Sequence, residues 1–525
     1  PASMKNQTDW AFAAGINRLM YHTFQHQCLP DSLRPGMTMG PYGVHWDRNQ
    51  TWWPYVGEYH KYVARCQYML QKGATVADVL YLSPEDAPFV FRAPESALYS
   101  DTLIDRRGHN FDACPPSLLC GAEVRDGKVV FPSGAQYSML VLPHFRTMTP
   151  GLLAKVRELV AAGAVVAGQP PVHTPGLTGY PESDSRLKAM ADDLWGADAD
   201  APGIVAHRYG KGTVYCGAGL LEKEDNLYPH YSVTSDILER DLGIGDDFTS
   251  SDGNVRYIHK RAGEADVYFV ANRTPDEIRD TCVFRVSGKQ PQLWDPVTGE
   301  TRDLTSFADN GTTTAIDMSF GDYQSFFVVF AGRPEHNTGA PNFPAVVADT
   351  ALAGPWHVAF DPKWGGPGDV DFEELTDWSR SEDEGIRYYS GTAMYSTDFD
   401  YKRPDDGTRV YLNLGDVRNI ARVWINGDCA GTVWAAPWEI DVTDCIMDGK
   451  NDLCVEVTNL WVNRLIGDER REDDGICGGE WPDWLTGGNP RPSDRYTFTT
   501  FRHYGSDSPL QPSGLLGPVR LVEKR

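Results

Sequence analysis

The chain has 525 residues, and its 48 Lys and Arg against 73 Asp and Glu give a formal net charge of −25. At about 150 residues per domain this length predicts three or four domains, and a hydrophobic content of 41% supplies several buried cores. The acidic balance, with no run rich in Lys or Arg, argues against nucleic acid and anionic membranes as partners, because phosphate binding needs clustered positive charge. The sequence contains no run of 18 apolar residues, so it predicts no membrane-spanning helix.

Residues 1–75 are predicted to form one strand and one helix joined by a long loop. The strand is expected at 15–22, and the helix at 55–72, where apolar side chains recur every three or four residues before Gly73. One such unit cannot bury its own faces, so we expect it to be the last βα unit of a (β/α)8-type barrel. The chain begins PASMKNQTDW, which predicts a piece of a longer protein.

Residues 76–248 predict a doubly wound α/β domain of the Rossmann or amidotransferase-like type. Continuous apolar runs at 76–82 and 137–142 are typical of strands buried on both faces, and Thr149 is placed to cap a helix. No glycine-rich nucleotide motif follows a strand, and no Cys or Ser follows the strand 164–167 where a nucleophile would stand. We therefore expect this domain to pack rather than to catalyse.

The rest of the chain is predicted to be all-β, so the whole is multidomain α/β plus all-β. From residue 249 the apolar pattern alternates with period two, which predicts a small β-sandwich over 249–333. A Pro- and Gly-rich linker follows at 334–348. Residues 349–525 contain about eight alternating strands and an Asn-Gly hairpin signal at 426–427, which fits a jelly-roll sandwich.

Catalytic carboxylates cannot be located by spacing among 73 acids, and we assign none. The predicted strand 15–22 ends in histidines rather than acids, with His22 and His26 at the end that faces a barrel's active site. These two are either ligands for sugar hydroxyls or hydrogen-bonded structural groups, and the residues alone leave both open. The ten cysteines include no C-x-x-C pair, which disfavours zinc ribbons, and no metal ligand is assigned.

The loop at 25–53 carries more aromatic and hydrogen-bonding side chains than an ordinary connector. His45, Arg48, Trp52 and Trp53 lie on it. Loops of this length are usually functional or disordered, and this composition disfavours disorder. We expect the loop to form the rim of a site for a sugar-sized ligand.

Several runs in the chain resemble glycoside hydrolase family 106. They are DWAFAAGINR at 9–18, PGMTMGPYGVH at 35–45, QTWW at 50–53, YVARCQ at 62–67 and VADVLYL at 76–82. The resemblance continues through NFDAC at 110–114 and reaches VTNLWVNRLIG at 457–467, which is similar to the galactose-binding-like domain of family 2 glycosidases.

The resemblance implies an inverting α-L-rhamnosidase with a barrel catalytic domain, a calcium ion near the sugar and a periplasmic or secreted location, although a cytoplasmic location stays open. In such enzymes the acidic pair precedes the segment where this chain starts. The parent protein is thus expected to be an exo-acting rhamnosidase on polysaccharide or glycoconjugate, with this chain alone inactive and the calcium ligands not identifiable in it. The oligomeric state is not predicted.

Two other functions stay open at this stage. The parent could be a β-galactosidase-like glycosidase with the same accessory domains. Alternatively, the chain could be a non-catalytic carbohydrate-binding or accessory fragment, whose sandwich either binds sugars or braces a barrel. Tryptophans at 434, 438, 481 and 484 are candidates for sugar stacking in the sandwich.

Overall fold

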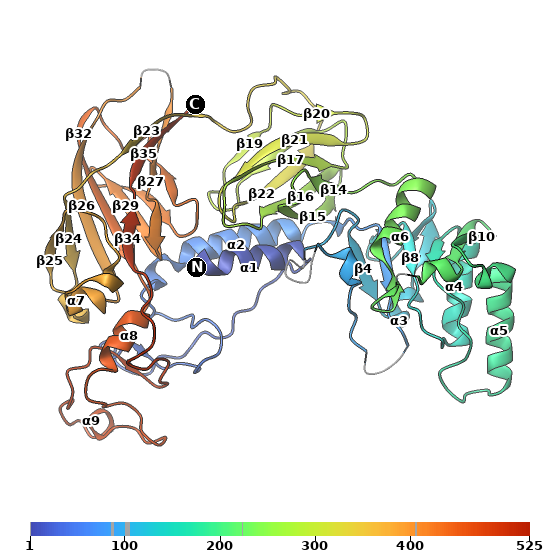
Figure 1. The fold of residues 1–525 in the computed structure, drawn as a ribbon, viewed down its shortest axis with the longest axis horizontal. Helices are drawn as coiled ribbons and strands as arrows, with labels where there is room; N and C mark the ends of the chain where they lie inside the picture. Colours follow the sequence, from blue (N-terminus) through green and yellow to red (C-terminus); the bar gives the residue numbers. More distant parts are fainter. Residues whose placement is uncertain (1, 86–88, 100–104, 223, 405–406) are drawn as a thin grey trace.

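The computed structural model describes residues 2–85, 89–99, 105–222, 224–404 and 407–525. Figure 1 shows an elongated arrangement, with the C-terminal sandwich at one end and the α/β domain at the other. Helices α1 (Ala2–Ala13) and α2 (Val56–Leu70) lie between them, beneath the small sandwich. The two helices therefore act as a strut that joins the β domains.

The predicted helix is confirmed as α2, but the predicted strand at 15–22 is wrong. This segment follows α1 as an irregular extended stretch. A strand needs a neighbouring strand to accept and donate its backbone hydrogen bonds. Here the amide of Ile16 donates to Ala11 O at 2.9 Å, and that of Leu19 donates to Gln67 Oε1 at 2.8 Å. The structure thus shows a helix pair where a βα unit of a barrel was predicted.

The helix pair is buried on both sides. Phe12 meets Phe269 of the small sandwich edge-on at 5.9 Å, and Tyr62 lies 5.5 Å from Trp434 of the C-terminal sandwich. Of the faces that a lone βα unit could not bury, Tyr62 and Val63 on the helix are buried, whereas Ile16 and Met20 in the stretch before the loop are exposed. The shared core holds residues from all three regions: Phe12, Trp46, Trp52, Tyr55, Tyr59, Tyr62, Val63, Cys66, Leu70, Ile258, Val267, Phe269, Ala271, Phe327, Val329, Ile420 and Trp434.

A buried ion pair fixes α1 to the small sandwich. Lys5 Nζ donates to Asp9 Oδ2 at 2.8 Å, to Tyr323 O at 2.7 Å and to Ser325 Oγ at 2.9 Å. The hydroxyl of Tyr62 donates to the other oxygen of Asp9. Every ammonium proton of Lys5 thus has an acceptor, which is the condition for burying a charge.

The α/β domain is built on a six-stranded sheet of order β10-β11-β9-β8-β3-β4, parallel except for the β10–β11 pair. Thr149 caps α4 as predicted, with its hydroxyl accepting from the amide of Leu152. The sheet strands are β3 (Val79–Leu82), β4 (Phe111–Cys114), β8 (Met139–Val141), β9 (Val165–Ala167), β10 (Val205–Tyr209) and β11 (Gly212–Cys216). Outside the sheet lie η2 (Glu95–Ala97), α3 (Pro116–Leu119), β5 (Glu123–Arg125), β6 (Lys128–Val130), β7 (Gln136–Tyr137), α4 (Pro150–Ala162), α5 (Glu182–Trp195), η3 (Gly196–Asp200), η4 (Ala218–Leu220), β12 (Glu224–Asp225), β13 (Tyr228–Pro229), α6 (Tyr231–Asp236) and the π-helix η5 (Ile237–Asp241).

The small sandwich pairs a four-stranded sheet, β14-β17-β21-β20, with a six-stranded sheet, β19-β18-β22-β16-β15-β2. Its last strand, β2 (Ala74–Thr75), comes from the stretch that follows α2, so the strut is also joined to it through the backbone. The other strands are β14 (Phe248–Ser250), β15 (Val255–Ala262), β16 (Ala265–Asn272), β17 (Ile278–Phe284), β18 (Gln290–Trp294), β19 (Thr301–Asp303), β20 (Ala308–Asp309), β21 (Thr314–Phe320) and β22 (Ser325–Ala331).

The C-terminal sandwich has a four-stranded sheet, β23-β35-β27-β31, and a six-stranded sheet, β25-β24-β26-β32-β29-β30. Asn426 and Gly427 adopt φ of 53° and 85° in the turn between β29 and β30, which confirms the hairpin signal. The strands are β23 (Val346–Ala351), β24 (Trp356–Phe360), β25 (Asp369–Phe372), β26 (Thr392–Tyr401), β27 (Arg409–Asn413), β28 (Asp416–Arg418), β29 (Ile420–Ile425), β30 (Asp428–Val433), β31 (Glu439–Asp441), β32 (Gly449–Thr458), β34 (Gly514–Gly517) and β35 (Arg520–Lys524); the helices are η6 (Pro362–Trp364), η7 (Trp378–Arg380), α7 (Glu384–Arg387), α8 (Val462–Asp468) and α9 (Asp483–Thr486).

Candidate functional site

The long loop is held against a C-terminal arm, which we define as residues 495–504. Strand β1 (Pro35–Gly36) of the loop pairs in parallel with β33 (Phe498–Thr499) of the arm. The amide of Thr38 also donates to Thr500 Oγ1 at 3.0 Å. Because the two segments lie at opposite ends of the sequence, no local pattern could have predicted this pairing.

The three predicted histidines, His22 just before the loop and His26 and His45 on it, lie in two different environments. His22 and His26 are exposed. His45 is half-buried, its Nε2 has no hydrogen-bond partner among the described residues, and its ring lies 5.6 Å from that of His503 on the arm. Burial and the neighbouring His45 lower the pKa of His503. The structure thus brings His45 to a residue that sequence reasoning missed, while His22 and His26 stay on the open surface.

Arg48 braces the first half of the loop. Its Nη2 donates to Gln27 O at 3.0 Å and its Nε to Asp31 Oδ1 at 3.3 Å. Gln27 in turn bonds both backbone groups of Met37, at 2.9 Å and 2.8 Å. These contacts order the loop, while the exposed face of Arg48 is still available to a ligand.

The two adjacent tryptophans differ in what they offer a ligand. Trp52 is 4% exposed and packs edge-on against Trp46 at 5.2 Å. A ring buried to this extent stabilises the core of the strut rather than stacking on a sugar. Trp53 is half-buried and lies 6.0 Å from Phe24, so part of its ring can still meet a ligand.

Exposed apolar side chains gather on the loop and the arm. Phe24 is 73% exposed and Tyr42 is 68% exposed. Large rings in such positions suit stacking on sugar faces, and clusters of this kind mark binding surfaces. Their neighbours along the loop and arm are Met20, Met39, Val44 and Phe501.

Two buried polar side chains in the loop lack partners for one oxygen each. Asp47 and Asn49 are fully buried, and Asp47 Oδ2 and Asn49 Oδ1 have no hydrogen-bond partner among the described residues. Burial raises the pKa of Asp47, although a hydrogen bond from the Asn49 amide opposes this. Orphaned oxygens of this type are donors that a hard cation would take.

The acids beside the arm are already paired with arginines. Asp468 lies 3.1 Å from Arg464, and Glu469 bonds Arg495 and Arg502. These contacts hold both carboxylates in place against guanidinium groups. The arm itself, residues 495–504, contains no Asp or Glu, so it supplies no carboxyl group to the surface that it forms with the loop.

Residues 1–308 match the alpha-L-rhamnosidase family, glycoside hydrolase family 106. The chain belongs to this family. The match covers the strut, the loop with every predicted site residue, the α/β domain and most of the small sandwich.

One solved relative matches the family 106 chain along its whole length. The rhamnosidase from Novosphingobium sp. PP1Y superposes with a TM-score of 0.81 and 29% identity, covering 100% of this chain and 46% of its own. A curated relative from Formosa agariphila, named as a putative beta-glucuronidase, is 26% identical over 100% of this chain and 62% of its own length. The chain thus spans about half to three fifths of these relatives.

A second match identifies the type of the C-terminal sandwich in this family 106 chain. Residues 377–492 match the galactose-binding-like domain of family 2 glycosyl hydrolases. Of its tryptophan candidates, Trp434 is buried in the shared core and Trp438 packs against the sandwich core, whereas Trp481 is 40% exposed. In the described part of the chain, no helix is both long and apolar enough to cross a bilayer.

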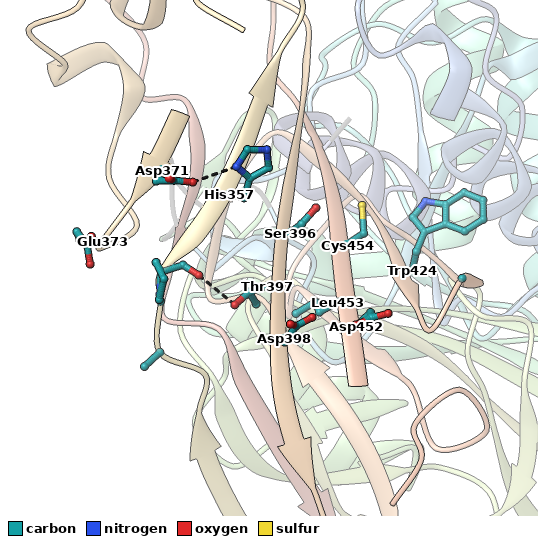
Figure 2. Close-up of a pocket in the computed structure, with 14 residues that line it drawn as sticks. His357, Asp371, Glu373, Ser396, Thr397, Asp398, Trp424, Asp452, Leu453 and Cys454 are labelled. Atoms are coloured by element: carbon teal, nitrogen blue, oxygen red, sulfur yellow. Dashed lines mark hydrogen bonds and ion pairs between the residues drawn. The ribbon is translucent and has the colours of Figure 1, made fainter. Parts of the chain in front are cut away.

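A hollow of about 870 Å³ lies on the outer face of the six-stranded sheet of that sandwich. Figure 2 shows Trp424 on one side of it and His357 with Asp371 on the other. His357 Nδ1 lies 3.0 Å from Asp371 Oδ1. The other lining residues of the hollow that Figure 2 labels are Glu373, Ser396, Thr397, Asp398, Asp452, Leu453 and Cys454.

Proposed function

We propose that the protein to which this chain belongs is an exo-acting, inverting α-L-rhamnosidase that acts on polysaccharide or glycoconjugate. The observation that carries the proposal is the family match over residues 1–308, which includes the whole loop. The likeness to a rhamnosidase structure at a TM-score of 0.81 supports it. Secretion or export to the periplasm fits this substrate class and stays a prediction.

In this proposal the loop binds the sugar and the reacting acids come from elsewhere. Imidazoles of His22, His26 and His45 bond sugar hydroxyls, and the rings of Trp53 and Tyr42 supply apolar contact. An inverting reaction needs one carboxylic acid to protonate the leaving oxygen and one carboxylate to activate water on the opposite face. Asp47 is 1% exposed and cannot touch a substrate in this conformation. We propose from the family resemblance that the reacting acids belong to other parts of the parent protein, so that the chain alone is inactive.

Calcium stays part of the proposal as a ligand of the loop. The orphaned oxygens of Asp47 and Asn49 are of the kind that calcium takes. Two oxygens are fewer than the six to eight that calcium requires, so the remaining donors would be sugar hydroxyls, water or other groups. We derive no catalytic step through the ion.

The test is to assay the longer parent protein with three aryl glycosides. We expect release from the α-L-rhamnoside alone, with the β-anomer of rhamnose as first product by NMR. Release only from the β-D-galactoside would favour the galactosidase alternative. Release only from the β-D-glucuronide would favour the activity in the name of the Formosa relative.

A second candidate function is carbohydrate binding by the C-terminal sandwich. The hollow beside Trp424 favours it, because hydroxyls and carboxylates stand there next to an aromatic ring. Its acids, Asp371, Glu373, Asp398 and Asp452, would repel uronates, so the expected ligand is a neutral sugar. Calorimetric titration with rhamnose-containing oligosaccharides tests this. Trp424→Ala should abolish saturable binding, and Tyr180→Ala, a change of an exposed aromatic side chain in the α/β domain, should leave it intact.

A further inference from the structure

A histidine and two acids converge where the α/β domain meets the small sandwich. They are His109 before β4, Glu239 on η5 and Asp246 before β14. One potential ligand atom from each lies within 4.8 Å of the other two. The three come from separate segments, and η5 is a π-helical turn, a feature often found at functional sites.

His109 is buried and aimed into this cluster. Its side chain is 0% exposed, and its Nε2 is a buried atom with no hydrogen-bond partner among the described residues. Asp246 Oδ1 is likewise buried and without such a partner. A buried polar atom without a partner is unfavourable, and a bound ligand would supply the missing partner.

The other nitrogen of His109 is fixed by a carboxylate. His109 Nδ1 lies 2.9 Å from Asp78 Oδ2, and Arg285 of the sandwich holds Asp78 with contacts of 3.1 Å and 2.9 Å. A carboxylate–histidine pair of this kind sets the tautomer that leaves Nε2 as a lone-pair donor, as in many metal sites.

The spacing fits a metal better than a hydrogen-bonded ion pair. His109 Nε2 lies 3.5 Å from Asp246 Oδ1 and 3.7 Å from Glu239 Oε1. Both distances exceed the usual N–H···O range of about 2.7–3.2 Å. Ligands bound to zinc at about 2.0–2.2 Å on a tetrahedron lie about 3.4 Å apart, which is close to the observed separations.

We propose that His109, Glu239 and Asp246 bind a divalent transition-metal ion of the zinc class, with Asp78 as the orienting carboxylate. An imidazole with two carboxylates suits zinc, whereas calcium prefers oxygen donors alone. The ion would link the α/β domain to the segment that leads into the small sandwich. Glu239 is 48% exposed at its side chain, so the ion can reach the site from solvent.

Gly108 offers a variant that alters the site without removing a ligand. A Cβ at this position would lie 2.2 Å from the carboxylate of Asp246, so Gly108→Ala must displace Asp246. Glu239→Gln removes one ligand charge at a partly exposed residue and should fold. His173, whose Nδ1 lies 3.8 Å from Asp184 at the surface, provides a matched control as His173→Gln.

The experiment titrates untagged protein, first treated with chelator, with ZnCl2 by calorimetry, and follows Tm with and without zinc. We expect one equivalent of zinc to bind and to raise the Tm of the wild type. Glu239→Gln and Gly108→Ala should each weaken binding at least tenfold, and His173→Gln should not change it. No saturable binding by the wild type, or unchanged affinity in both site variants, would overturn the proposal. Glycosidase activity is not needed for the measurement.

Discussion

The strut and the loop are neighbours in sequence but are built on opposite principles. In the strut, Lys5, Asp9 and Tyr62 are buried and mutually hydrogen-bonded. In the loop, buried oxygens of Asp47 and Asn49 lack partners while large rings stand in solvent. The first arrangement maximises stability, and the second leaves capacity for a ligand. Variants in the strut should therefore lower the unfolding free energy, whereas variants in the loop should lower kcat/KM of the parent enzyme.

The largest effect is expected from Lys5→Met in the strut. The variant leaves the Asp9 carboxylate buried without its counter-ion, which should lower the unfolding free energy by about 3–5 kcal/mol. Chemical denaturation monitored by Trp fluorescence measures the loss. The double variant Lys5→Met, Asp9→Asn serves as the control, because it removes the unpaired charge and should recover much of the stability. Equal instability of both variants would contradict this reading of the ion pair.

A variant of Trp52 tests whether this residue stabilises the strut or contacts a ligand. Trp52→Ala empties a buried site beside Trp46 and should cost about 3–5 kcal/mol of unfolding free energy. Its effect on sugar contact should be small, because the ring is 4% exposed. If the folded fraction of the parent enzyme instead lost kcat/KM with an unchanged Tm, Trp52 would belong to the ligand side.

Residues of the loop and of the segment just before it should behave in the opposite way. In the parent enzyme, His22→Ala and Trp53→Ala should each reduce kcat/KM by the equivalent of about 1–3 kcal/mol, through a lost hydrogen bond or ring contact. Melting should change little, because His22 is exposed and Trp53 half-buried. Phe145→Ala, a change of a residue outside the loop, is a suitable kinetic control. A fall in Tm with intact kinetics would assign the residue to packing.

How far the sequence predicts this molecule depends on whether the determining contacts are local. The helix α2, the Thr149 cap and the Asn426-Gly427 turn follow from neighbouring residues, and all three are confirmed. The stretch 15–22 has a strand-like pattern, but its backbone partners are Ala11 and Gln67, which no pattern specifies.

The candidate sites show the same limit. The loop's aromatic composition predicted a ligand surface, yet it could not distinguish the buried Trp52 from the half-buried Trp53. His503 and the cluster around His109 depend on contacts between distant segments. Neither histidine lies in a sequence pattern that would single it out.

The smallest expected effect is a pH dependence of stability. It comes from a second buried cluster of paired charges, in the small sandwich. Burial lowers the pKa of His259, but Asp247 at 3.0 Å and Asp266 at 3.0 Å outweigh it and raise that pKa above the ordinary value. Arg285 also contacts Asp247, and Lys289 contacts Asp266. Burial opposes the ionised form of Asp266, but the hydrogen bonds from His259 and Lys289 outweigh it and lower the pKa of Asp266. The folded state therefore favours the protonated imidazole.

The sign of the pH dependence follows from this shift. A group whose pKa is raised on folding stabilises the fold fully below its unfolded pKa of about 6.5, and the contribution disappears as pH rises through the folded pKa. The stabilisation that His259 contributes, measured as the difference in unfolding free energy between the wild type and His259→Gln, should therefore fall as pH rises above about 6.5. This pH-dependent difference should be smaller than the effect of any variant above, and the difference between the wild type and His22→Gln, at an exposed site, should not change with pH in this way. A difference between the wild type and His259→Gln that stayed constant over the same interval would mean that His259 is neutral in the folded protein.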